Sequence, residues 1–157
     1  MQVDVVNIIQ AMLAPGIMIS ACGLLLLGMN NKYSLVVNRI RLLDDEKRNL
    51  SLKHREGALP KNDENRLLSI RRQLVKLAYR VKLVRNAVLA YTIAVGLFIA
   101  SCVIIGMQHI FSEDSFFYVA LVLFLLGMTS VFAGAVLAAV ESYKGYEIVQ
   151  IELKEEY

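Results

Sequence analysis

The hydrophobic positions of this chain gather in three long runs without a charged residue. These runs cover residues 5–31, 87–112 and 115–140, and the sequence is much more polar between the first two. A helix of about 20 apolar residues crosses the hydrocarbon core of a bilayer. A soluble domain would instead distribute its apolar residues between charges, at a period of about 2 or 3.6. The pattern therefore predicts three membrane-spanning helices, at 5–31, 87–107 and 116–140.

Residues 32–86, between the first two spans, are rich in charge but keep a helical pattern. Apolar residues alternate at spacings of three and four, which is typical of a coiled-coil seam, at Leu67, Ile70, Leu74, Leu77, Val81, Val84 and Val88. Gly57 and Pro60 are expected to end the preceding helix, so the segment folds back on itself. The predicted fold is an all-α membrane protein with three transmembrane helices, in which a cytoplasmic antiparallel helical hairpin extends the first two.

The charges predict the orientation of the spans. Of the 17 Lys and Arg residues, 15 lie between positions 32 and 85. Segments rich in Lys and Arg stay on the cytoplasmic side of a membrane. We therefore expect the N-terminus outside, and the hairpin and the C-terminus in the cytoplasm. The length of 157 residues and the hydrophobic content of 57% fit a single membrane domain.

The segment 141–157 is acidic, with five acids and two lysines and so a net charge of −3. The hairpin has 15 bases and six acids, a net charge of +9. The tail is expected on the same side of the membrane as the hairpin, so it either docks along the basic arms or stays solvated. The sequence leaves both arrangements open.

The stretch APGIMISACGLLLLGMNNKYSLVVNRIR, residues 14–41, resembles the signature of a family of bacterial membrane proteins called domain of unknown function 2721. In that signature a proline precedes a small-residue, leucine-rich helix, which ends in a polar turn and an R-x-R pair. The matching positions are Pro15, Ser20, Cys22, Gly23, Asn31, Arg39 and Arg41, whereas Lys32 stands where the pattern has arginine. The resemblance implies a multi-pass protein of the bacterial inner membrane and carries no established activity.

The first span has two contrasting faces. At about 100° per residue, one face carries the residues that a pore formed by several copies would place near its axis, namely Asp4, Asn7, Ala14, Met18 and Leu25. Gly16, Ser20 and Gly23 lie on the other face and are small enough for close helix packing. A similar ladder in the third span consists of Ser130, Gly134 and Ala138. Asn7 is equally consistent with a residue at the membrane interface.

The sequence shows no signature of catalysis. It has no nucleotide-binding, metalloprotease, dithiol or serine-hydrolase motif, and no carboxylate lies inside an apolar run. We therefore expect no catalytic, cofactor-binding or metal-binding residues, and no enzymatic activity. Cys22 and Cys102 are expected at depths that differ by roughly 10 Å, too far apart for a disulfide.

Two functions remain open on this basis. One is a homo-oligomeric structural or accessory assembly, alone or within a larger membrane complex, that displays the basic hairpin. The alternative is a channel-like pore lined by the first helix. The basic arms are expected to meet anionic lipid head groups rather than nucleic acid, because they start at the membrane surface. Lys32, Lys82 and Arg85 are the predicted lipid contacts.

Overall fold

The computed structural model consists of three long helices: α1 (Gln2–Arg55), α2 (Lys61–Phe111) and α3 (Ser115–Glu155). It describes the backbone of residues 2–55, 61–111 and 115–155, and the side chains of 6–53, 63, 66–108 and 116–145. Each helix contains a segment long and apolar enough to cross a membrane. The all-helical fold with three long apolar helices, predicted from the sequence, is confirmed.

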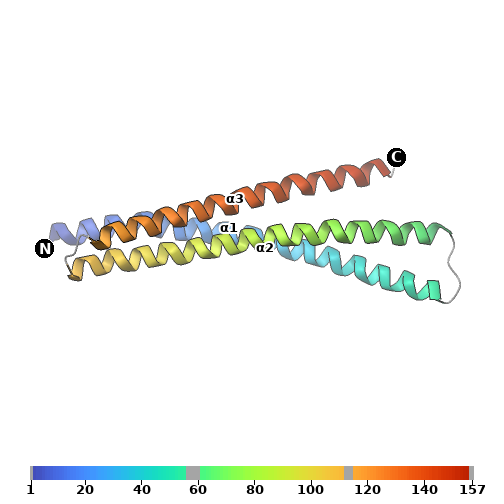
Figure 1. Cartoon of the computed structure of the whole chain (residues 1–157), viewed down its shortest axis with the longest axis horizontal. Coiled ribbons are helices and arrows are strands. Elements are labelled where there is room, and N and C mark those ends of the chain that lie inside the picture. The colour runs from blue at the N-terminus through green and yellow to red at the C-terminus, as the bar shows by residue number, and fades with distance from the viewer. Residues whose placement is uncertain (1, 56–60, 112–114, 156–157) are drawn as a thin grey trace.

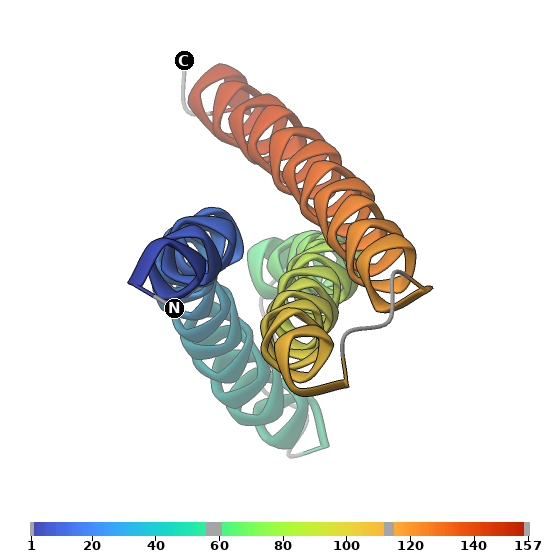
Figure 2. The same ribbon diagram turned by 90° about the vertical axis from the view of Figure 1, so that its left-hand side faces the viewer.

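The helices form an elongated rod in which α2 is the central element. It returns antiparallel along α1, and α3 then returns along α2 (Figure 1). The view along the rod shows α1 and α3 on different sides of α2 (Figure 2). Both outer helices pack extensively on α2 but scarcely touch each other. The position of α3 relative to α1 is therefore set mainly through α2.

The buried residues of α1 and α2 recur every seven positions. A seven-residue interval keeps one stripe of a slightly underwound helix against its neighbour. The buried stripes are Cys22, Met29, Val36 and Leu43 on α1, and Ile70, Leu77, Val84, Tyr91 and Phe98 on α2. The same stripe passes from the apolar part of each helix into its charged part, so one packing pattern joins the two parts.

Three clusters of buried side chains follow one another along the rod. The first two include residues of all three helices; Phe98 on α2 and Phe124 on α3, for example, meet with their ring centroids 5.5 Å apart. The third cluster is built from α1 and α2 alone, around Val36, Leu43, Ile70 and Leu77. Among the described side chains, α3 thus takes part in the clusters of the apolar part, whereas the cluster of the charged part is formed by α1 and α2.

Helix α3 approaches α2 closely because small residues line the contact. A Cβ atom added at Gly127 would lie 2.6 Å from the Phe98 ring, and one added at Gly134 would lie 2.8 Å from the Tyr91 ring. The Ser101 hydroxyl donates a hydrogen bond to the Ala120 carbonyl at 3.0 Å. Small residues bring backbones close together in this way between membrane helices, where polar side chains also bond across.

Helix α3 is longer than the span predicted from hydropathy. The apolar run ends at residue 140, but the helix continues to Glu155. The sequence after 140 has no proline, and its single glycine, Gly145, does not interrupt the helix. Helix α1 is likewise continuous through Pro15. The predicted turn at Gly57 to Pro60 lies outside the described residues.

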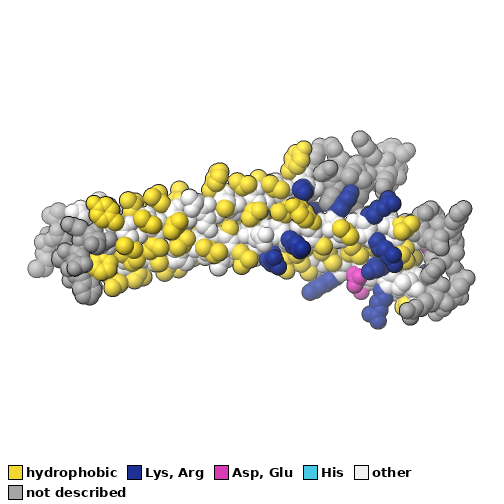
Figure 3. All heavy atoms as spheres, in the orientation of Figure 1, with side chains coloured by type: hydrophobic (Ala, Val, Ile, Leu, Met, Phe, Trp, Pro, Cys, Tyr) yellow, Lys and Arg dark blue, Asp and Glu magenta, His cyan; other side chains and the backbone are white. Residues whose placement is uncertain are grey.

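Charge divides the rod into two halves. On the face seen in Figure 3, the Lys and Arg side chains gather over one half, and the other half is almost entirely apolar and uncharged. The apolar half also exposes large hydrophobic side chains, including Leu24 (73%) and Phe132 (71%). Such exposure is unfavourable in water but expected for side chains that face lipid. At the boundary between the halves, a buried carboxylate of α3 meets cations of α1 and α2.

Candidate functional site at the boundary of the apolar region

A buried carboxylate marks the end of the apolar part of α3. Glu141 follows the last apolar run directly, and its side chain is only 1% exposed. It continues a seven-residue series of buried positions on α3, after Ala120, Gly127 and Gly134. The three preceding members are small residues that face α2. Glu141 therefore points in the same direction, into the space between the helices.

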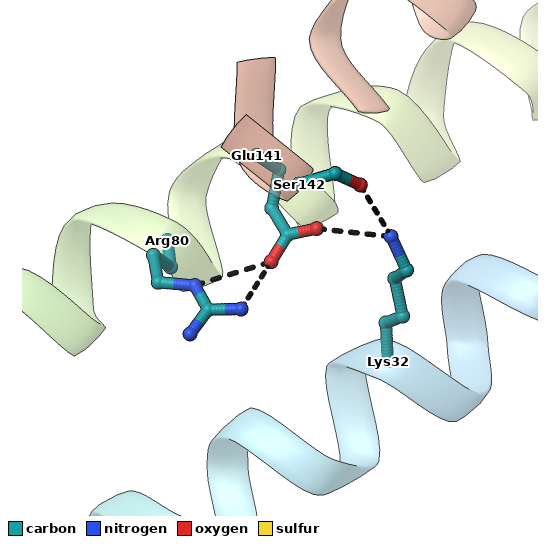
Figure 4. Close-up of polar contacts among 4 residues, drawn as sticks. All are labelled: Lys32, Arg80, Glu141 and Ser142. Atoms are coloured by element: carbon teal, nitrogen blue, oxygen red, sulfur yellow. Dashed lines mark hydrogen bonds and ion pairs between the residues drawn. The ribbon is translucent and has the colours of Figure 1, made fainter. Parts of the chain in front are cut away.

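Two cations from the other two helices meet this carboxylate (Figure 4). Arg80 of α2 donates to Oε1 of Glu141 from both Nη2, at 2.6 Å, and Nε, at 3.1 Å. Lys32 of α1 donates from Nζ to Oε2 of Glu141 at 3.2 Å and to Oγ of Ser142 at 2.7 Å. We call Lys32, Arg80, Glu141 and Ser142 the boundary cluster. It joins all three helices at one level of the rod.

Two residues that follow the boundary cluster on α3 also contact α2. Gly145 lies one turn after Glu141, and a Cβ atom there would be 2.8 Å from Nη2 of Arg80. A side chain at this position would therefore push against the guanidinium. Lys144 places its ammonium 4.3 Å from the centroid of the Tyr79 ring, a cation–π contact between α3 and α2. Together these contacts hold the first turn of α3 beyond the apolar run against α2.

The boundary cluster ties the three helices together through one buried carboxylate. Each carboxylate oxygen of Glu141 already accepts a bond from a cation. Buried carboxylates are stable when they are paired and hydrogen-bonded, and costly when they lose a partner. Because α1 and α3 scarcely touch elsewhere, the contacts of Lys32 with Glu141 and Ser142 give these two helices a direct polar link.

The three predicted lipid contacts differ in their surroundings. Lys82 and Arg85 are exposed on α2, close to the boundary cluster in sequence. The ammonium group of Lys32, by contrast, pairs with Glu141 and donates to Ser142, although the Lys32 side chain remains 45% exposed. The prediction did not anticipate this internal pairing. Contact with lipid head groups stays a prediction for all three residues.

The predicted pore-facing residues do not share one environment. Asn7 is exposed, Ala14 lines a pocket between the helices, and Leu25 is 42% exposed. Met18 packs against the cluster formed by Cys22, Ala94 and Phe98 within the same chain. The side chain of Asp4 lies outside the described residues. This face of α1 is thus turned partly toward the chain's own α2 and α3.

The two small-residue sets also differ. On α3, Ser130 donates to the Ala90 carbonyl at 2.8 Å, Gly134 meets Tyr91, and Ala138 packs against the cluster around Met29 and Val84. On α1, a Cβ atom added at Gly16 or Gly23 would have no neighbour within 4 Å. Ser20 is exposed and donates only to the Gly16 carbonyl of its own helix, at 3.4 Å. The small face of α1 is therefore open in the single chain.

Over the residues whose placement is described, no group of three or more His, Cys, Asp or Glu side chains is arranged to hold a metal ion. Cys22 and Cys102 are both free thiols. The carboxylate closest to the apolar region within this part of the chain, Glu141, forms ion pairs with Lys32 and Arg80.

Sequence reasoning missed the boundary cluster. The charge pattern places Glu141 in an acidic tail that is either solvated or docked, and it does not distinguish Arg80 from the other bases of the hairpin. A usable signal does exist, because Ala120, Gly127, Gly134 and Glu141 are spaced by seven residues. A carboxylate that continues a line of small, packed residues faces the neighbouring helix, where it needs a cation.

These features define the class of the protein: a small all-helical chain whose three apolar helices suggest a multi-pass membrane protein. The chain belongs to the family described as protein of unknown function (DUF2721), whose model matches residues 12–151. This match confirms the resemblance seen in the first span and extends it over nearly the whole chain. Comparisons with curated proteins and with solved structures give no match.

Proposed function

We propose that the protein is a non-enzymatic structural or accessory protein of the bacterial inner membrane that assembles from several copies. Its three apolar helices span the bilayer, and the charged halves of α1 and α2 project into the cytoplasm as a rigid coiled-coil arm. Through this arm the protein contacts anionic lipid head groups at the membrane surface and docks other components of a larger membrane complex.

The continuous buried stripe through α1 and α2 is the observation that carries this proposal. Met29 lies in the apolar part of α1, and Val36 and Leu43 lie beyond it in the same seven-residue series. The apolar and charged halves of α1 and α2 should therefore move together as one rigid body. Lys82 and Arg85 are exposed where the arm begins, and each such base gains about 1 kcal/mol near an anionic leaflet.

The open face of α1 supports self-assembly. Gly16, Ser20 and Gly23 have no neighbouring helix within the chain. Small residues at this spacing allow two membrane helices to approach closely enough for backbone contacts. The pore alternative lacks comparable support, since Met18 already packs within its own chain. We therefore propose that the open small-residue face, and not the predicted pore face, meets a second copy.

Cysteine labelling tests the orientation that this function requires. In a variant lacking Cys22 and Cys102, single cysteines at Gln2 and Gln108 should react with a membrane-impermeant maleimide in intact cells. Cysteines at Ala58 and Gln150 should react only after the membrane is permeabilised, because the basic segments stay inside. Labelling at Ala58 in intact cells would place the arm outside and contradict the proposal.

Oxidative cross-linking tests the self-assembly. In the same background, Ser20→Cys should form a disulfide-linked dimer in native membranes on copper-catalysed oxidation, because a bridge needs Cα atoms about 4.4–6.8 Å apart. Phe132→Cys is the control, since Phe132 is 71% exposed on α3 and is expected to face lipid. Equal cross-linking of the two variants, or none of Ser20→Cys, would argue against an interface at this face.

A further inference from the structure

An apolar pocket of about 260 Å³ lies between the three helices near the turn from α2 to α3. Helix α1 contributes Ala11, Ala14 and Pro15 to its lining, and α3 contributes two aromatic residues, Phe117 and Phe124. All of these residues lie within the uncharged runs of the sequence. The pocket therefore belongs to the apolar half of the rod, away from the boundary cluster.

The pocket exists because small side chains meet where α1 and α3 diverge. Ala14 on α1 and Ala120 on α3 are too short to bridge the space between two helices that scarcely touch. On α2 the lining extends from Ser101 to Gln108. At 1.5 Å per residue, the seven steps from Ser101 to Gln108 correspond to roughly 10 Å along the helix axis. The pocket is therefore extended in the direction of the helices.

The lining offers few polar partners that would hold a water molecule in place. A buried water needs two to four polar partners, whereas an apolar cavity of comparable size stays dry and takes up apolar molecules. The Ser101 hydroxyl, one of the few polar groups of the lining, already donates to the Ala120 carbonyl at 3.0 Å. Gln108, the other polar side chain of the lining, is half-buried and lies near the end of α2.

We propose that this pocket binds one acyl chain of a membrane glycerophospholipid. The inference rests on the proposed membrane location, where acyl chains surround the rod and run parallel to its helices. The chain fills the space between Ala14 and Phe124, and the Gln108 amide donates a hydrogen bond to the ester carbonyl of the lipid. An ester group lies at the membrane-surface end of an acyl chain, and Gln108 lies near the end of α2, at Phe111, that is expected at the outer membrane surface.

Photolabelling in vesicles tests this site. The parent protein is reconstituted in phosphatidylethanolamine and phosphatidylglycerol that includes a phospholipid with a diazirine in its acyl chain. After irradiation, label should concentrate on the peptides that contain 11–15 and 117–124. Ala14→Phe fills the pocket and should abolish this labelling. Ala133→Phe makes the same chemical change at an exposed position on α3 and should leave the labelling unchanged.

A second variant that fills the pocket, Ala11→Phe, shows whether any loss of lipid at Ala14→Phe is only a folding defect of that variant. Native mass spectrometry should show a phospholipid retained by the parent and by Ala133→Phe but lost from both filling variants. Equal labelling or equal retention in all four proteins would overturn the site, as would retention of an isoprenoid lipid in place of a phospholipid. Release of the parent from membranes by alkaline carbonate would instead refute the membrane location itself, so the two failures are distinguishable.

Discussion

Gly134→Leu is expected to destabilise the protein strongly, because no space exists for a side chain at this position. A single added Cβ atom would lie 2.8 Å from the Tyr91 ring, and that tyrosine is 1% exposed. A buried ring cannot move aside as a flexible chain end does, so α3 must shift away from α2. Overpacking a well-filled contact costs about 1–3 kcal/mol, or more for larger groups. The measurement is the thermal unfolding temperature in mild detergent.

Gly96→Leu is the matched control for this substitution. A Cβ atom added at Gly96 of α2 has no neighbour within 4 Å, so the leucine should point outward and leave the unfolding temperature of the protomer nearly unchanged. Gly23→Leu makes the same change on the open face of α1, and should weaken self-assembly without loosening the protomer. Equal loss of protomer stability for Gly134→Leu and Gly96→Leu would mean that α3 does not pack on α2 as described.

Hydropathy and spacing predict most of this fold because each signal extends over many residues. The three uncharged runs predict the apolar helices, and the three-four spacing predicts that Ile70, Leu77 and Val84 face a partner. The structure shows these three side chains buried. Over a run of about twenty residues, single residues that do not fit the pattern have little effect on the prediction of a helix. The end of a helix depends on a few residues only, so the end of α3 at Glu155 was not predictable.

The boundary cluster was not predictable by the same route. Its formation depends on the register in which α1, α2 and α3 align, and a sequence does not state that Lys32, Arg80 and Glu141 reach the same level. A single misplaced turn would put each charge against lipid or water. Ser130, Gly134 and Ala138, which are spaced by four residues, predict close packing of α3. The series that leads to Glu141 has a different spacing, of seven residues, and passes through Gly127 and Gly134.

The pocket was missed for a related physical reason. The sequence pattern predicts Ala14 on a face between copies, because its small size favours helix contact. The structure instead places it beside a space that α1 and α3 leave open within one chain. Small residues permit close contact, but they equally permit a void where no helix arrives. Only the relative path of the three helices decides between these two outcomes.

Arg80→Ala is expected to cost more stability than any other single change in the boundary cluster. Glu141 is 1% exposed and would be left with Lys32 as its remaining cation partner. Removing one partner of a buried ion pair costs about 3–5 kcal/mol, and because Arg80 is itself 21% exposed, water should reduce the loss to about 2 kcal/mol. Lys32 is 45% exposed, so Lys32→Ala should cost less than about 1 kcal/mol.

A double substitution separates the charge interaction from packing. Arg80→Met combined with Glu141→Leu removes both charges and keeps apolar volume, and exchanges of this kind are often neutral or stabilising. We therefore expect the double variant to unfold at a higher temperature than Arg80→Ala, close to the parent. Lys82→Ala, at an exposed base two residues further along α2, should have almost no effect. If Arg80→Ala were as harmless as Lys82→Ala, Glu141 would not depend on Arg80, and the boundary cluster would not hold α3 in place.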